Sequence, residues 1–193
     1  HQEARRQRQM CIRDRVQSLI GEGEALLLQV TGERWTSMIA RTKDDVRLER
    51  SDLGSDSLDA LVRRIRLGLN LSNFEYENLP PFDVSAAHQL YLKTIGILEP
   101  GLTGVSKIYF VPDRAMQNLP PSILLTEPAE LPVAEYSITA GGSVFRNLSF
   151  LMKSFAVAIL PSADSFVARR ELRKTGTGAS HFLGVGDPDF RNE

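Results

Sequence analysis

The chain has 193 residues, 42% of them hydrophobic and 24% charged, which suits one globular domain, or one and a half, with a substantial core. Its 23 basic and 24 acidic residues nearly balance, so charge gives no reason to expect a nucleic-acid partner. No apolar run reaches the roughly 18 residues that a membrane span needs, and the polar, basic start does not resemble a signal peptide. A single cysteine excludes an internal disulfide framework. We therefore expect a cytoplasmic protein, because reducing compartments disfavour disulfides.

The first 15 residues are set apart by their composition. Residues 5–15 read RRQRQMCIRDR, which matches the translation of a transposase sequencing adapter with its mosaic end. We therefore predict that residues 1–15 are not native and that Cys11 is no candidate nucleophile. The alternative is a basic amphipathic helix or an arm that contacts nucleic acid, and helix propensity is good over residues 4–20. Without residues 1–15 the balance is mildly acidic, with 18 basic and 22 acidic residues.

Three strands are predicted next, joined by segments of turn composition and hairpin length. They are Glu24–Thr31, Trp35–Arg41 and Val46–Arg50. In the third strand, Val46 and Leu48 alternate with Arg47 and Glu49, which predicts one wet face. Such consecutive strands with short connections indicate an antiparallel meander, and we interpret it as scaffold.

Two helices follow. After a polar linker at residues 51–57, apolar residues recur at helical spacing, namely Leu58, Leu61, Val62, Ile65 and Leu69. Three arginines face elsewhere on this helix and form either an anion-binding patch or, as we favour, a solvated face; they are Arg63, Arg64 and Arg66. Asp83 is a good N-cap for a second helix that is predicted to run to Pro100-Gly101. His88 has no carboxylate or cysteine at i±3 or i±4, so we predict a structural role.

The stretch Lys107–Leu125 is predicted to be central to the fold. Residues 108–111, IYFV, form a short apolar run that Pro112-Asp113 closes. A run this short and uniformly apolar is typical of a strand buried on both faces in a parallel or mixed sheet. We predict that Asp113 caps the turn and is neither an acid nor a base.

The second half of the chain contains two more apolar runs. Residues 155–160, FAVAIL, predict a second buried strand that Pro161 stops, and Ser162 can cap a helix to about residue 173. Residues 182–186, FLGVG, predict a third short strand. Between the first two strands, residues 127–151 predict a long loop with a short strand or bridge at 136–139, and 143–153 predict a short helix.

No arrangement of residues predicts a catalytic, cofactor-binding or metal site. Gly184-Val185-Gly186 lacks the third glycine of a dinucleotide fingerprint, and Pro188 disfavours the helix that would follow. Gly141-Gly142 lacks the Gly-Lys-Ser/Thr of a phosphate loop. His181 has no serine or cysteine elbow beside it. The three histidines are scattered and show no metal-ligand spacing.

Three motifs in order resemble a known family. They are the apolar strand that runs into Pro112-Asp113 and then Leu119-Pro120, the segment Phe155–Ser162 ending in Pro-Ser, and the segment Leu183–Phe190 with its Gly-Asp-Pro-Asp-Phe end. Together they resemble the N-terminal part of a CHAT domain, a caspase-like cysteine peptidase module often fused to tetratricopeptide repeats. The resemblance covers residues 24–190. Pro121 and Gln117 depart from the family, which usually has Phe and His or a similar residue there.

The resemblance implies an α/β fold, with a mixed sheet, the N-terminal meander and flanking helices, in an incomplete caspase-like domain. It implies a CHAT-like subdomain over residues 16–181 and the first strand of the caspase-like core over 182–193. The family's catalytic histidine and cysteine follow later strands, which we expect beyond Glu193, so no residue of this chain is expected to be catalytic and no cofactor is expected. Whether the parent is an enzyme stays open.

The resemblance also implies partners. These would be a protein or peptide substrate, an upstream repeat region and a downstream catalytic half, with no nucleic acid and no membrane. A pseudo-protease or scaffold that mediates protein–protein interaction is the alternative, and a small-molecule-binding α/β domain is a third.

Overall fold

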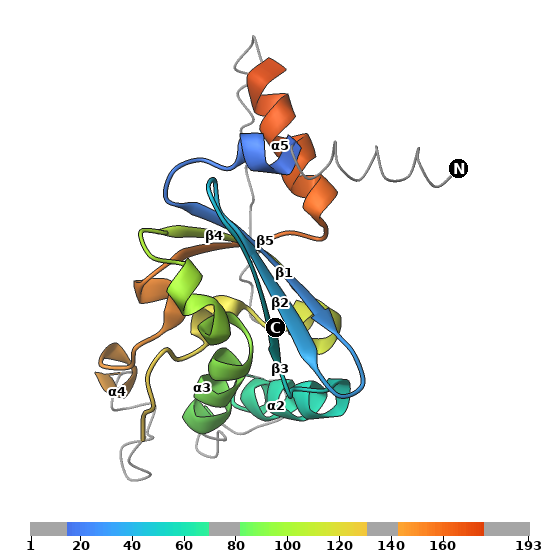
Figure 1. The fold of residues 1–193 in the computed structure, drawn as a ribbon. Coiled ribbons are helices and arrows are strands. Elements are labelled where there is room, and N and C mark those ends of the chain that lie inside the picture. Colours follow the sequence, from blue (N-terminus) through green and yellow to red (C-terminus); the bar gives the residue numbers. More distant parts are fainter. Residues whose placement is uncertain (1–14, 70–81, 131–142, 176–193) are drawn as a thin grey trace, which may run out of the picture.

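The computed structural model describes residues 15–69, 82–130 and 143–175. Its centre is a five-stranded mixed sheet in the order β3-β2-β1-β4-β5 (Figure 1). The strands are β1 (Glu24–Thr31), β2 (Thr36–Arg41), β3 (Val46–Ser51), β4 (Lys107–Val111) and β5 (Ala156–Ile159). β1 pairs antiparallel with β2, and β2 antiparallel with β3, whereas β1–β4 and β4–β5 pair parallel. The predicted α/β class, with its mixed sheet and antiparallel meander, is confirmed.

The antiparallel meander forms because apolar residues are aligned across the three strands and short turns connect them. Leu28 lies opposite Ile39, which lies opposite Leu48, so one register holds across the three strands. The first turn is closed by the Gly32 amide, which donates to the Trp35 carbonyl at 2.9 Å. Such short connections select antiparallel neighbours.

Helices and 3₁₀ turns cover one face of the sheet. They comprise α2 (Ser55–Leu67), α3 (Val84–Lys93), η1 (Ile95–Gly101), η2 (Arg114–Asn118), η3 (Pro121–Ile123), α4 (Ser143–Arg146) and η6 (Leu151–Lys153). Asp83 caps α3 as predicted, because its carboxylate accepts from the Ala86 amide at 2.8 Å. The prediction that this helix continues to Pro100-Gly101 is wrong. The Thr94 hydroxyl donates to the Leu90 carbonyl at 2.6 Å where α3 ends, and the chain continues as η1.

The main core lies between this face of the sheet and α2, α3 and η1. Ala25 and Leu27 of β1, Met38 of β2, and Ile108 and Phe110 of β4 are all fully or almost fully buried. On the helices, the core side chains are Leu58, Leu61, Val62, Ile65, Leu90, Tyr91, Ile95 and Leu98. Four of the predicted apolar positions therefore lie on the buried face of α2, whereas Leu69 lies beyond the end of this helix and is 45% exposed.

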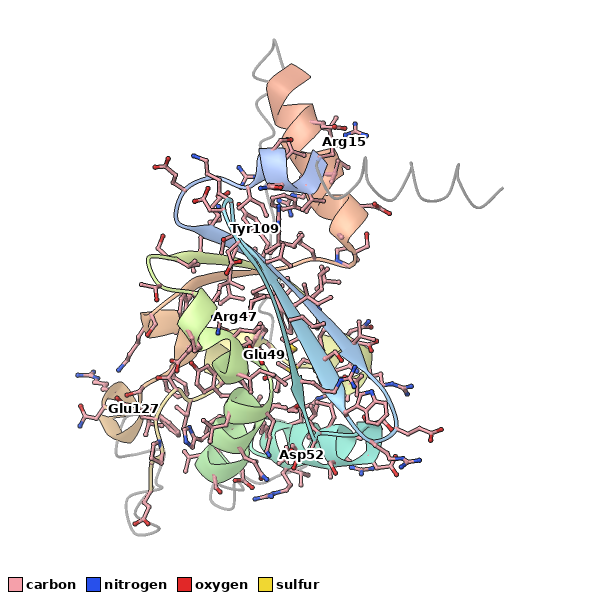
Figure 2. All side chains as sticks on the ribbon, viewed as in Figure 1. Arg15, Arg47, Glu49, Asp52, Tyr109 and Glu127 are labelled. Carbon is pink, nitrogen blue, oxygen red and sulfur yellow. The ribbon has the colours of Figure 1, made fainter. Side chains whose placement is uncertain are left out.

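Among the residues that the structure describes, only part of the second face of the sheet is covered. Helical residues 15–19 and α5 (Ala163–Thr175) lie together at one end of it (Figure 1). Tyr109, labelled in Figure 2, meets Phe166 of α5 edge-on, with ring centroids 5.0 Å apart. Ser162 caps α5 as predicted, since its hydroxyl accepts from the Ser165 amide at 3.2 Å.

Two predictions about strand exposure need correction. In β3 the apolar Val46 and Leu48 are the exposed residues, and the charged Arg47 and Glu49 are half-buried on the helix-covered side (Figure 2). β5 was predicted to be buried, but Ala156 and Ile159 are exposed because β5 is an edge strand of the described sheet.

Several predictions fall outside the described residues. They concern residues 1–14, the strand or bridge at 136–139, Gly141-Gly142, His181, and the strand at 182–186 with its Gly-x-Gly. Within the described ranges, no helix combines the length and apolar character that crossing a membrane requires.

Candidate functional site

The carboxyl ends of β1 and β4 are the first place to look for a site. The strand order reverses between these parallel neighbours, because β1 continues to β2 on one side and β4 to β5 on the other. Open α/β sheets commonly bind ligands at such a reversal point. Asp113 follows β4 here, and its carboxylate accepts from the Thr31 amide at 2.8 Å and the Arg114 amide at 2.9 Å.

Arg114 completes this connection in an unusual backbone conformation. Its φ is 51°, in the left-handed region that non-glycine residues seldom adopt. Its Nε donates to the Thr31 carbonyl at 3.0 Å, so Asp113 and Arg114 together bind both backbone groups of Thr31. The predicted capping role of Asp113 is confirmed, and its oxygens are engaged by backbone amides.

A buried polar chain continues from Thr31 into the protein. The Gln29 amide donates to the Thr31 hydroxyl at 3.0 Å, and this hydroxyl lies 3.1 Å from that of Thr36. The Thr36 hydroxyl in turn donates to the Leu53 carbonyl at 2.7 Å. Gln29 Oε1 is buried and has no hydrogen-bond partner within the described part of the chain. These hydrogen bonds tie β1 and β2 to the segment that precedes α2, and they bring no nucleophile to a base.

A second polar cluster lies at the amino ends of β1 and β4. The Glu24 carboxylate pairs with Arg170 of α5, accepts from the Gly21 amide at 2.9 Å and accepts from the Tyr109 hydroxyl at 3.2 Å. Arg170 also donates to the Tyr109 hydroxyl at 2.9 Å. Burial acts to raise the pKa of Glu24, but the hydrogen bonds from Arg170 and Gly21 outweigh it, so this pKa is lowered. The cluster holds α5 on the sheet.

A shallow groove of about 290 Å³ lies next to this cluster. The loops at 21–24, 42–45 and 100–105 line it. Its charged groups include Glu22 and Lys43, which pair with each other at 2.9 Å. Lys43 is therefore already paired with Glu22, and Asp44 and Asp45 add acidic groups to the polar lining of the groove.

His88 and the three arginines of α2, which the sequence analysis considered as possible site residues, have contacts typical of structural or surface residues. His88 Nδ1 lies 3.0 Å from the Leu125 carbonyl, which supports the predicted structural role. Of the three arginines on α2, Arg64 pairs with Asp83 at 2.8 Å, while Arg63 and Arg66 are exposed. Among the described residues, no group of three or more His, Cys, Asp or Glu side chains could hold a metal ion.

Sequence reasoning missed the Glu24–Arg170 pair and the polar chain at Gln29. The first joins residues 146 positions apart, and neither charge differs from an ordinary surface residue in its sequence context. The second had a visible signal, since Gln29 and Thr31 occupy alternate positions of a strand that is otherwise apolar on that side.

Comparison with known proteins identifies no family. No protein-family model matches this sequence, and no curated protein matches it. Among solved structures, a chain described as "Alp12 filament structure" aligns with a TM-score of 0.33 and 9% identity, over 83% of this chain and 50% of that one. This chain thus corresponds to half the length of that structure, and the likeness is too weak to support a functional argument.

Proposed function

We propose that this chain is a non-catalytic, N-terminal part of a CHAT-type caspase-like cysteine endopeptidase. The observation that supports the proposal best is where two of the three family-like motifs lie. Pro112-Asp113 directly follows β4, and Pro161-Ser162 follows β5 after Leu160, so both motifs lie at the carboxyl ends of neighbouring parallel strands. In both turns the polar side chain accepts a backbone amide, at Asp113 and at Ser162.

In this proposal the parent protein hydrolyses peptide bonds with a histidine–cysteine dyad located beyond Glu193. The histidine acts as a base, the cysteine thiolate attacks the peptide carbonyl, and amide groups stabilise the oxyanion. The residues described here would support the sheet that carries the dyad. A protein or peptide substrate, an upstream repeat region and a cytoplasmic location belong to the same proposal.

The experiment is to recover the gene from its source and read it past Glu193. The proposal expects a histidine and, later, a cysteine, each after an apolar strand. The complete protein should then cleave a fluorogenic peptide, and replacing that cysteine by alanine should abolish cleavage. A reading frame without the dyad, or cleavage that survives the alanine variant, would contradict the peptidase assignment.

The alternative is a pseudo-protease or scaffold that binds other proteins. The observation that favours it is the set of exposed apolar side chains on the second face of the sheet, among them Val30 and Leu48. A complete protein that carries no dyad but retains a specific partner would support this alternative.

A further inference from the structure

Within residues 15–69, 82–130 and 143–175, no helix covers the half of the second sheet face that β2 and β3 form, and this half has the properties of a docking surface. We call it the open face, and it comprises Leu28, Val30, Trp35, Ser37, Ile39, Arg41, Val46, Leu48 and Arg50 of β1, β2, β3 and the first turn. An apolar row leads into it, because Leu28, Ile39 and Leu48 are direct cross-strand partners. Leu28 is partly buried against the cluster that contains Phe166, and Leu48 is the exposed end of the row.

Exposure distinguishes this face from its opposite. Val30 is 57% exposed, Leu48 61% and Val46 47%, whereas Leu27 and Met38, which point to the other side of the same strands, are fully buried. Contiguous exposed apolar surface of this kind marks interaction sites in proteins.

The alternation of apolar and charged residues in β3 indicates that the open face is covered when the protein is bound to a partner. A strand with one buried face places its apolar residues on that face, and its register decides which face this is. In β3 the pairing with β2 directs Val46 and Leu48 to the open face, while Arg47 packs near Gly101 on the helix side. The sequence of β3 therefore matches a sheet whose second face is covered over the meander.

The charged residues on the open face indicate which kind of partner would bind there. Arg41 Nε is buried beside the apolar row and has no hydrogen-bond partner among the described residues. Arg50 stacks over the Trp35 ring at 5.1 Å. The one carboxylate that β1, β2 and β3 present on this side is Glu24, which is already bound by Arg170. A symmetric second copy would bring these arginines against each other, whereas carboxylates would pair with them.

The width of the face fits one helix. Three neighbouring strands span about 10 Å from the first to the third, which is about the diameter of an α-helix with its side chains. We propose that the open face binds one amphipathic helix of a partner protein. The helix lies along the strands, its apolar stripe covers the apolar side chains of the open face, and its flanking carboxylates pair with Arg41 and Arg50. The proposal does not depend on peptidase activity.

A tryptophan-free synthetic peptide tests this proposal directly. Roughly 18 residues are long enough for substantial helicity, with a leucine stripe flanked by glutamates. Two matched peptides serve as comparisons, one with lysines in place of the glutamates and one with the same composition scrambled. Trp35 is the only tryptophan of the chain and lies at the edge of the open face, so its fluorescence reports binding to the full chain.

We expect the glutamate peptide to bind, and the lysine and scrambled peptides to bind at least ~10-fold more weakly, because like charges oppose docking. Leu48→Ser should weaken binding at least ~10-fold, as loss of a central apolar contact does. Arg41→Gln should weaken it and reduce its dependence on salt. Leu92→Ser, which removes an exposed leucine from α3 instead, should leave binding unchanged. Circular dichroism checks each fold, and Val30→Ser replaces Leu48→Ser if that variant does not fold.

Three results would overturn the proposal. The glutamate peptide could fail to bind, the lysine peptide could bind equally well, or Leu48→Ser could bind like the unmodified chain. Sedimentation provides a separate check. A dimer that forms with rising concentration and is abolished by Leu48→Ser would assign the open face to self-association instead.

Discussion

Replacing Asp113 by alanine should destabilise the protein more than any comparable change at an exposed acidic residue. The substitution removes both acceptors of the Thr31 and Arg114 amides. The Thr31 amide belongs to a residue that is only 5% exposed, so water cannot replace the lost carboxylate easily. Hydrogen bonds to charged groups contribute about 1.5–3 kcal/mol each, and part of this is recovered by relaxation, so we expect a loss of about 2–4 kcal/mol.

Two further variants separate the causes of this loss. Asp113→Asn keeps the shape and one acceptor oxygen, so it should lose about half as much. Asp59→Ala, at an exposed position of α2, is the control and should change stability by less than about 0.5 kcal/mol.

Urea unfolding followed by Trp35 fluorescence and circular dichroism measures these differences. The midpoint should move while the denaturant slope stays constant, because the surface exposed on unfolding is unchanged. The reasoning fails if Asp113→Ala is as stable as the Asp59→Ala control, since the carboxylate would then contribute nothing that water does not supply.

Other predictions concern the close packing at Gly54, the buried hydroxyl of Thr36 and the carboxylate of Glu24. Gly54→Ala should destabilise by about 2 kcal/mol or more, as forced overlap in a packed site does, because a Cβ there would lie 2.1 Å from the Glu33 carbonyl oxygen. Gly32→Ala, where the nearest atom lies at 3.6 Å, is its matched control in urea unfolding. Thr36→Val should cost about 1–3 kcal/mol by the same measurement, since it leaves a buried carbonyl unpaired. The lowered pKa of Glu24 means that its stabilising contribution is present above the ordinary value of 4.5 and is lost as the pH falls below it. Melting temperatures of the unmodified chain and Glu24→Gln should therefore differ at neutral pH and converge in acid; a constant difference would contradict this.

The local parts of the fold could be predicted from the sequence. The meander follows from alternation and hairpin-length turns, and Asp83 and Asp113 follow from the chemistry of capping. The end of α3 could not be predicted, because Ile95 and Leu98 continue an apolar spacing that also suits the 3₁₀ turn. Only the Thr94 side chain, which bonds back to the end of the helix, marks the change.

The non-local parts could be predicted less well. Residues 155–160 are uniformly apolar, which is typical of a buried strand, but the exposure of β5 depends on its place at the edge of the described sheet. No local pattern determines that place. Likewise the pairing of Glu24 with Arg170 depends on where α5 lies on the sheet, and ordinary surface charges give no sign of it.

The parallel pairing of β1 with β4 has a consequence for how the chain folds. β1, β2 and β3 meet their neighbours within a few residues of each turn, whereas Glu24 reaches its β4 partner Lys107 across 83 positions. Closing so long a loop has an entropic cost that is not offset until the pairing is nearly complete. We therefore expect the meander to assemble early and the pairing of β4 with β1 to be the slower step. Until then, the edge of β1 that β4 later occupies carries unpaired backbone groups, so this interval is when the chain is most open to association with other copies.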